Sequence, residues 1–167
     1  MTIDTNKKYQ AVMHTTKGDI TLDLFASEVP KTVNNFVFLA RDGFYNGVTF
    51  HRIIKGFMIQ GGDPLGTGSG GPGYNIPDEL PVKRDYLRGT IAMARTSLPN
   101  SATSQFFIMH QNYNLGKDYV IFGIATSGLA VVDTIANTPT VKGDDGQLSK
   151  PTQIVSINSI DIIETAK

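Results

Sequence analysis

The sequence predicts a mainly β protein in which antiparallel strands close into a barrel and helices cap its ends. Short runs rich in β-branched and aromatic residues follow one another along the chain, separated by loops rich in Gly, Pro, Asn and Ser. Only two segments have helical periodicity, so the pattern differs from the alternating strands and helices of a parallel α/β protein. The 167 residues suffice for one domain with a substantial core, without internal repeat or linker. We therefore expect one domain over residues 1–167.

The first predicted elements are a hairpin over residues 9–25 and a helix after it. Apolar and polar residues alternate from Asp19 to Leu24, and Lys17-Gly18 provides the turn from a strand over residues 11–15. The helix has Pro30 near its first turn and Gly43 just after its end. Its apolar residues lie on one face and should plug one end of the β structure: Val33, Phe36, Val37 and Ala40.

Residues 50–63 form the most informative segment and predict two short strands in a hairpin. The segment is rich in β-branched and aromatic residues, is interrupted at Lys55-Gly56 and ends in a Gly-Gly-Asp-Pro turn. If the turn centres on residues 55 and 56, Arg52 lies opposite residue 59 or 60, so its side chain shares a surface with the Gln60 amide. A guanidinium beside an apolar patch can bind a peptide group while a ring fits alongside. The pattern therefore favours recognition of a polypeptide.

The remaining segments continue the β pattern. A glycine-rich loop covers residues 61–73, and β-like runs follow at residues 90–94, 105–109 and 120–125. A second, shorter helix is predicted between Gly128 and Pro139. We expect a turn at residues 143–146 and a closing strand over residues 154–163.

The composition excludes several classes of function. Fifteen basic and fifteen acidic residues give zero formal net charge, so no long-range field would attract nucleic acid or an anionic membrane. The absence of cysteine excludes disulfides, thiolate chemistry and Cys-ligated zinc. The first ten residues lack the apolar core of a signal peptide, and no apolar run approaches the roughly 18 residues of a membrane span. We therefore expect a cytoplasmic protein with no nucleic-acid or membrane partner.

Two glycine patterns match nucleotide-binding motifs only in part. Residues 66–71 have the glycine spacing of a dinucleotide-binding loop, but Pro72 and Pro77 follow where such a loop needs a helix. Gly116-Lys117 precedes Asp118 and not the Ser or Thr of a P-loop. We interpret both as surface loops.

No metal site or hydrolytic site is predicted. His14, His51 and His110 are dispersed, with no pair at helical spacing. Asp144-Asp145-Gly146 lacks the ligand spacing of a calcium loop and is interpreted as an acidic turn. The chain also has no G-x-S-x-G motif. We expect neither metal nor cofactor.

Five motifs carry a resemblance to a known family: Phe50-His51-Arg52-Ile53-Ile54, residues 56–63, Met93-Ala94, residues 104–108 and residues 120–123. In these motifs the sequence resembles the cyclophilin family of peptidyl-prolyl isomerases. The resemblance covers residues 9–163, and in length and in residues 66–74 the chain is most similar to short single-domain bacterial members. It implies an eight-stranded closed antiparallel barrel with two capping helices, a substrate groove outside the barrel, and a rotamase that assists protein folding as a chaperone does.

The resemblance also implies the roles of individual residues. Arg52 would be the catalytic residue. The proline pocket would consist of Phe57, Met58, Phe107 and Leu115. The rest of the groove would be lined by His51, Gln60, Ala94, Arg95, Thr96, Gln105 and Tyr119, with backbone groups near residues 94–96 binding the peptide.

The chemistry of X–Pro rotation agrees with this set of residues. Amide resonance opposes rotation with a barrier of about 18–20 kcal/mol, and no covalent bond has to break. In the twisted transition state the prolyl nitrogen gains a lone pair, so a donor placed there binds that state better than either planar isomer. Arg52 would be this donor. Because a guanidinium stays protonated, the step should be nearly independent of pH through the neutral range.

Expected partners are proline-containing peptides and unfolded proteins, and we expect a monomer. Asn114 stands where eukaryotic members carry a Trp that contacts cyclosporin, so we expect weak binding of that drug. Arg95 replaces a common Asn, and Leu98 is similar to a one-residue insertion beside the groove. A module that binds proline-containing segments without turnover is the alternative function, but the presence of Arg52 favours an enzyme.

Overall fold

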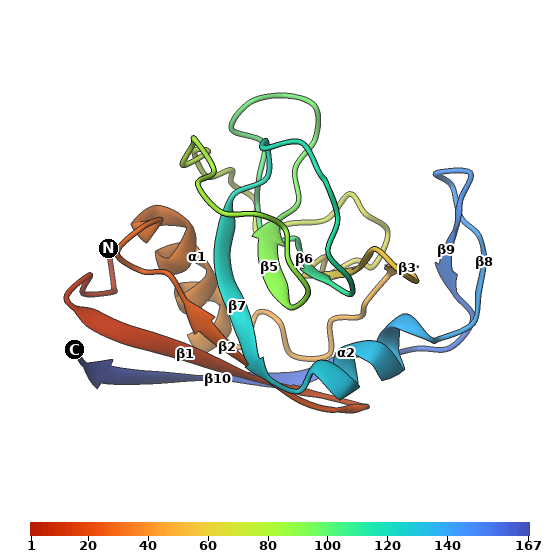
Figure 1. Cartoon of the computed structure of the whole chain (residues 1–167), viewed down its shortest axis with the longest axis horizontal. Helices are drawn as coiled ribbons and strands as arrows, with labels where there is room; N and C mark the ends of the chain where they lie inside the picture. Colours follow the sequence, from red (N-terminus) through yellow and green to blue (C-terminus); the bar gives the residue numbers. More distant parts are fainter.

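The computed structural model describes all residues from 1 to 167 and contains ten strands and two helices (Figure 1). Eight strands form one antiparallel sheet in the order β10-β1-β2-β7-β5-β6-β4-β3, and β8 and β9 form a separate hairpin. The helices are α1 (Pro30–Arg41) and α2 (Leu129–Ala136). The strands are β1 (Lys7–Thr15), β2 (Gly18–Leu24), β3 (Arg52–Ile54), β4 (Met58–Gly61), β5 (Thr90–Met93), β6 (Phe106–Met109), β7 (Ile121–Ser127), β8 (Thr140–Lys142), β9 (Leu148–Pro151) and β10 (Ile157–Ala166).

The prediction of a closed barrel is wrong. The strand ladder is open between β10 and β3, since no pairing joins these two strands. β3 has only three residues, and the chain before it reaches the segment before β10 through irregular contacts. These are one isolated bridge between Thr49 and Ser156 and loop hydrogen bonds such as that from Phe50 N–H to Val155 C=O. The mainly β class and the two helices are as predicted.

The first hairpin and the first helix lie at the positions in the chain that the sequence predicts. β1 and β2 pair from Tyr9 with Leu24 to Thr15 with Gly18, and the apolar alternation puts one face into the core. α1 buries the predicted stripe and contacts β10. Its N-terminus has no cap from its own N-cap residue. Instead, the Glu79 carboxylate accepts hydrogen bonds from the N–H groups of Lys31 (3.0 Å) and Thr32 (2.8 Å), which satisfies two free donors of the first turn.

The central hairpin has the predicted register. Arg52 lies opposite Gln60, and Ile54 opposite Met58. Further along, the predicted turn at residues 143–146 is the tip of the β8–β9 hairpin, whose strands the sequence analysis did not predict. The closing strand begins at Ile157 and not at residue 154, because the backbone of Val155 already bonds the chain before β3.

The core has two parts. The larger cluster of 32 buried residues lies between the sheet and both helices and contains most of the buried aromatic side chains, such as Phe36, Phe106 and Phe122. Neither helix has the length and the apolar character needed to cross a membrane. The smaller cluster lies on the opposite side of β5 and β6 and consists of Met58, Tyr86, Ala92, Phe107, Met109 and Ile121. β5 and β6 are therefore buried on both faces, which explains the apolar runs at residues 91–93 and 106–109.

Candidate functional site

Arg52 lies on the edge strand β3 with its guanidinium held at two points. Nε donates to Oδ2 of Asp145 at 2.9 Å, and Nη1 donates to Oε1 of Gln60 at 3.4 Å. The second contact follows from the hairpin register, because directly paired residues project from the same face of a sheet. The side chain remains 30% exposed, so a ligand can reach its free N–H groups.

The Gln60 amide belongs to a chain of hydrogen bonds. Its Nε2 donates to Oε1 of Gln105 at 3.2 Å. Nε2 of Gln105 in turn donates to the carbonyl oxygens of Gly68 at 2.9 Å and Gly70 at 3.1 Å. The position of the glycine-rich loop is thereby connected with that of Arg52.

Asp63 fixes the same loop from inside. Its carboxylate is buried and accepts the N–H groups of Leu65 (2.8 Å) and Thr67 (3.0 Å), and also that of Gly68. Burial alone would raise the pKa of Asp63, but these backbone donors, together with that of Gly70, hold it below its usual value. The carboxylate is therefore ionised at neutral pH and acts as the anchor of the loop.

An apolar cavity of about 250 Å³ opens beside Arg52. Phe107 and Met58 belong to the smaller core cluster, so the floor of the cavity is rigidly packed. At its walls, Phe107 meets Tyr119 edge to face, with ring centroids 5.6 Å apart, and Phe57 stacks on Tyr113 at 4.3 Å. The lining residues are Arg52, Phe57, Met58, Gln60, Ala94, Arg95, Phe107, Leu115 and Tyr119.

A larger and more polar cavity of about 720 Å³ continues from the apolar one past Gln60, Ala94 and Arg95. The guanidinium of Arg95 is fixed by Asp78: its Nη1 donates to Oδ2 of Asp78 at 2.5 Å in a nearly buried ion pair. The glycine-rich loop forms the opposite wall. The two cavities make one groove long enough for more than a single residue of a peptide.

A third, polar cavity of about 550 Å³ lies on the other side of Arg52 and Gln60. His51 lines it, together with the loop residue Thr67 and with Ser149 of β9. Burial lowers the pKa of His51, so its imidazole is neutral at neutral pH. Arg52 lines both this cavity and the apolar one, so its guanidinium is the charged group between them.

The structure brings the predicted site residues together. Nine of the twelve line the apolar cavity, Thr96 and Gln105 line the adjoining polar cavity, and His51 lies on the far side of Arg52. Sequence reasoning missed Asp145, which was interpreted only as part of an acidic turn, and Asp78. No local pattern indicated either contact, because Asp145 is 93 positions from Arg52 and Asp78 is 17 from Arg95.

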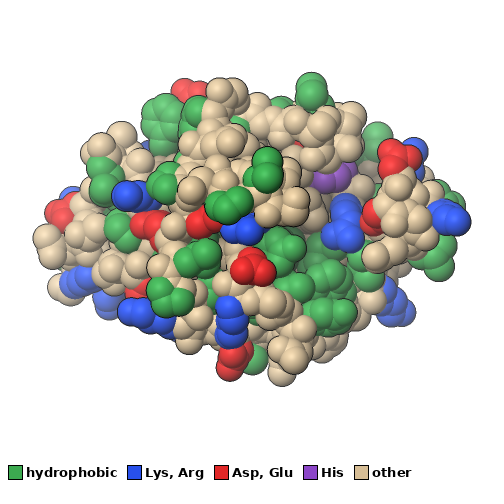
Figure 2. Space-filling model, turned by 90° about the horizontal axis from the view of Figure 1, so that it is seen from above, with side chains coloured by type: hydrophobic (Ala, Val, Ile, Leu, Met, Phe, Trp, Pro, Cys, Tyr) green, Lys and Arg blue, Asp and Glu red, His purple; other side chains and the backbone are tan.

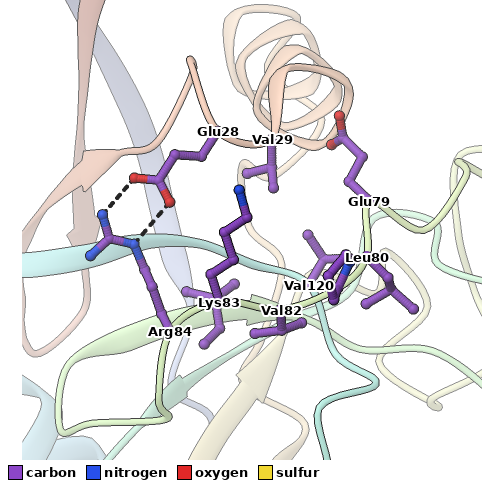
Figure 3. A pocket seen from close by; sticks show the side chains of 10 residues that line it. Glu28, Val29, Glu79, Leu80, Val82, Lys83, Arg84 and Val120 are labelled. Carbon is purple, nitrogen blue, oxygen red and sulfur yellow. Dashed lines mark hydrogen bonds and ion pairs between the residues drawn. The ribbon is translucent and has the colours of Figure 1, made fainter.

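Another cavity, of about 350 Å³, lies at the N-terminal end of α1 and shares no lining residue with the groove (Figure 3). Of its four charged residues, Glu28, Glu79 and Arg84 are engaged with each other or with the helix, and Lys83 forms no ion pair. Arg84 forms two hydrogen bonds with Glu28, at 3.1 and 2.5 Å, and Glu79 caps α1. Arg84 is therefore not available as a donor to a ligand in the way that Arg52 is.

The surface charges and the lining of the groove indicate which class of ligand the site binds. Figure 2 shows acidic and basic side chains interspersed over the face seen from above, without an extended region of one sign. An apolar cavity beside a fixed guanidinium, continued by a polar groove, is suited to a peptide segment that carries one compact apolar ring.

Comparisons with known proteins agree with this class. The family model for cyclophilin type peptidyl-prolyl cis-trans isomerase/CLD matches residues 10–161. A probable peptidyl-prolyl cis-trans isomerase A of Mycobacterium leprae is 44% identical over 174 residues, covering 91% of each chain. A peptidyl-prolyl cis-trans isomerase of Synechococcus elongatus is 54% identical over 102 residues, covering 61% of this chain and 69% of that protein.

Solved structures lead to the same family. The crystal structure of a Cryptosporidium parvum cyclophilin type peptidyl-prolyl cis-trans isomerase has a TM-score of 0.86 at 37% identity, covering 93% of this chain and 98% of that one. A second structure of that protein, in the presence of the dipeptide Ala-Pro, has a TM-score of 0.85. The chain therefore belongs to the cyclophilin family and is a peptidyl-prolyl cis-trans isomerase.

Proposed function

We propose that the apolar cavity binds the proline ring of an X–Pro segment and that Arg52 donates a hydrogen bond to the prolyl nitrogen as the peptide bond twists. The observation that carries this proposal is the fixed guanidinium at the rim of an apolar cavity of about 250 Å³. A proline ring is compact and apolar, so the cavity of Phe57, Met58, Phe107 and Leu115 suits it in both size and chemistry.

The geometry accounts for catalysis without covalent chemistry. A twisted X–Pro bond loses its resonance, and the lone pair that returns to nitrogen makes it a hydrogen-bond acceptor, which the nitrogen of the planar amide is not. A donor that bonds only this state lowers the barrier, whereas one that bonds substrate and transition state equally would not. Because the packed cavity holds the ring, we expect the acyl side of the bond to turn.

The polar cavity extends the proposal to the residues next to proline. Gln60, Arg95 and the backbone at Ala94 offer donors and acceptors to a peptide backbone. The Cryptosporidium structure in the presence of the dipeptide Ala-Pro supports an X–Pro unit as a ligand of this groove. We propose proline-containing peptides and unfolded chains as substrates of this groove.

The first test replaces Arg52 with Ala. A hydrogen bond to a charged donor contributes about 1.5–3 kcal/mol, so its loss should slow turnover by roughly ten- to 150-fold. Two-dimensional exchange NMR on a short X–Pro peptide measures the cis–trans rate directly, without a coupled protease.

Arg84→Ala is the matched control, since it removes an equally large cation that does not line the groove. Undiminished exchange in Arg52→Ala would eliminate Arg52 as the donor. Peptide binding by the wild type without any accelerated exchange would instead reveal a binding module.

Two further parts of this proposal concern the cyclosporin affinity and the assembly state. Asn114 offers no indole to cyclosporin, so binding should be weak, and the chain should be a monomer. Calorimetric titration with the drug and sedimentation of the protein check these two statements.

A further inference from the structure

Asp145 reaches Arg52 from a separate part of the fold. It lies at the tip of the β8–β9 hairpin, which stands apart from the main sheet, while β9 contacts β3 (Figure 1). The ion pair between Nε of Arg52 and Oδ2 of Asp145 is 2.9 Å long, with side-chain exposures of 30% and 28%. Asp145 is the one carboxylate that forms an ion pair with Arg52.

The Asp145 carboxylate is itself held in place. It accepts the N–H of Gln147 at 2.9 Å, and the Ser149 hydroxyl lies 2.8 Å from each of its oxygens. Ser149 is only 3% exposed, so this support comes from an anchored position of β9. The Gln147 N–H, Arg52 and the Ser149 hydroxyl lower the pKa of Asp145 to about 2, and the carboxylate is therefore ionised throughout the pH range of an assay.

The contacts on Arg52 divide the guanidinium into two edges. Asp145 accepts a hydrogen bond from Nε, and Gln60 accepts one from Nη1. The remaining N–H groups of the guanidinium are left for a ligand in the apolar cavity. Without a partner on Nε, a partly exposed arginine samples many rotamers, and the fraction of time in which its donors face the cavity falls.

We propose that Asp145 is the positioning residue of the site: it orients the Arg52 guanidinium toward the prolyl nitrogen without touching the substrate. This inference rests on the proposed role of Arg52. The β8–β9 hairpin then supplies the orienting anion, which explains why a hairpin outside the main sheet packs against its edge strand.

The test compares Asp145→Ala with Asp145→Asn and with the control Asp144→Ala. Asp144 is the neighbouring exposed carboxylate, which forms no ion pair or side-chain hydrogen bond, so its removal takes the same charge from the hairpin. A partly exposed ion pair predicts that Asp145→Ala lowers kcat about fivefold while KM changes less than about twofold. Asp145→Asn keeps an oxygen acceptor and should restore most of the loss, and Asp144→Ala should behave as the wild type.

A spectroscopic readout separates orientation from a general loss of structure. The Hε–Nε cross-peak of Arg52 should be sharp and slow to exchange with water in the wild type and in Asp145→Asn, and broadened in Asp145→Ala. Hairpin amide shifts show whether β8 and β9 remain folded. If Asp145→Ala opens the hairpin, Ser149→Ala provides the second comparison, because it loosens the carboxylate but keeps both members of the ion pair.

The double variant Arg52→Ala/Asp145→Ala distinguishes the two proposals. If Asp145 acts through Arg52, its removal costs nothing further once Arg52 is absent. An equal loss in both backgrounds would overturn the positioning role, as would an Asp145→Ala enzyme that turns over as fast as the wild type or faster. An Arg52→Ala enzyme of full activity would instead overturn the donor role, while the cross-peak would still report whether Asp145 orients the side chain.

Discussion

The glycine-rich loop beside Arg52 depends on single residues that contact its backbone. Asp63 binds its N–H groups, and Gln105 binds the carbonyl oxygens of Gly68 and Gly70. Gly70 leaves no room for a side chain, since a Cβ atom there would lie 1.9 Å from Oδ1 of Asp63. The wall of the groove thus depends on one carboxylate and on one position without a Cβ.

We predict that Gly70→Ala destabilises the protein by about 1–3 kcal/mol, because the buried Asp63 carboxylate has to move away from its donors. Displacement of the Gly70 carbonyl should also weaken peptide binding through Gln105. Urea unfolding and the peptide exchange assay measure the two effects. Gly116→Ala is the control, because its Cβ would meet only Asp118 at 3.4 Å and the backbone there has no positive φ. Equal stability of the two variants would contradict this account of the loop.

Whether a side-chain contact of the site could be predicted depends on how far apart in the sequence its two residues lie. The contact of Arg52 with Gln60 could be predicted, because a short hairpin fixes which side chains face each other. The contact with Asp145 could not, because a pattern in the sequence contains no information on where a distant hairpin packs. Most of the groove residues followed from the resemblance to the cyclophilins, and the residues that support them did not.

The three strands β10, β1 and β2 are connected by a histidine clip, which consists of His14, Asp19 and Asp161. The ring of His14 lies between two carboxylates, with Nδ1 2.8 Å from Asp19 and Nε2 3.0 Å from Asp161. The hydrogen bond with Asp161 and that with Asp19 raise the pKa of His14 above its usual value. The clip is therefore strongest when the imidazole is protonated.

We predict that His14 contributes to stability mainly at low pH. A group with a raised pKa in the folded state contributes fully below its unfolded pKa of about 6.5, and the contribution is lost as the pH rises through the folded value. Both carboxylates are exposed, so the effect should not exceed about 1 kcal/mol. Urea unfolding of the wild type and of His14→Gln at pH 6 and pH 9 measures it, with the larger difference expected at pH 6. An NMR titration of His14 with an unshifted or lowered pKa would refute the clip.

Local patterns predicted most of the elements. Both helices and the first two hairpins were predicted from the spacing of apolar residues. Pro30 and Gly43 also marked the ends of α1, and Gly128 and Pro139 those of α2. β8 and β9 were missed because their sequences, Thr-Val-Lys and Leu-Ser-Lys-Pro, are too short and polar to show alternation. β10 begins later than predicted, since loop contacts occupy Val155.

For the whole molecule, closure of the sheet was the feature that local patterns could not predict. Strand sequences indicate which residues are buried, but not whether the first and last strands of a ladder meet. Here β3 is too short, and irregular chain occupies the space between it and β10. The number of strands in the main sheet was predicted correctly from the resemblance, and the closed barrel was not.

We predict that the chain unfolds in one cooperative transition, because the larger core cluster includes residues of both helices and of most strands of the sheet. The protein has six Tyr and no Trp, so tyrosine fluorescence and far-UV circular dichroism are the suitable probes. Their urea transitions should coincide. Separate midpoints would mean that the smaller cluster beneath the groove unfolds on its own.

The backbone support of the glycine-rich loop also bears on the engineering of specificity. Asp63 and Gln105 bind only N–H and C=O groups of this loop. Any residue except proline would offer the same N–H at position 65, and neither anchor bonds the backbone of Ser69. The side chains of Leu65 and Ser69 border the polar cavity and are exposed. The chemical character of the rim can therefore be varied at these two positions while the anchors of the wall remain the same.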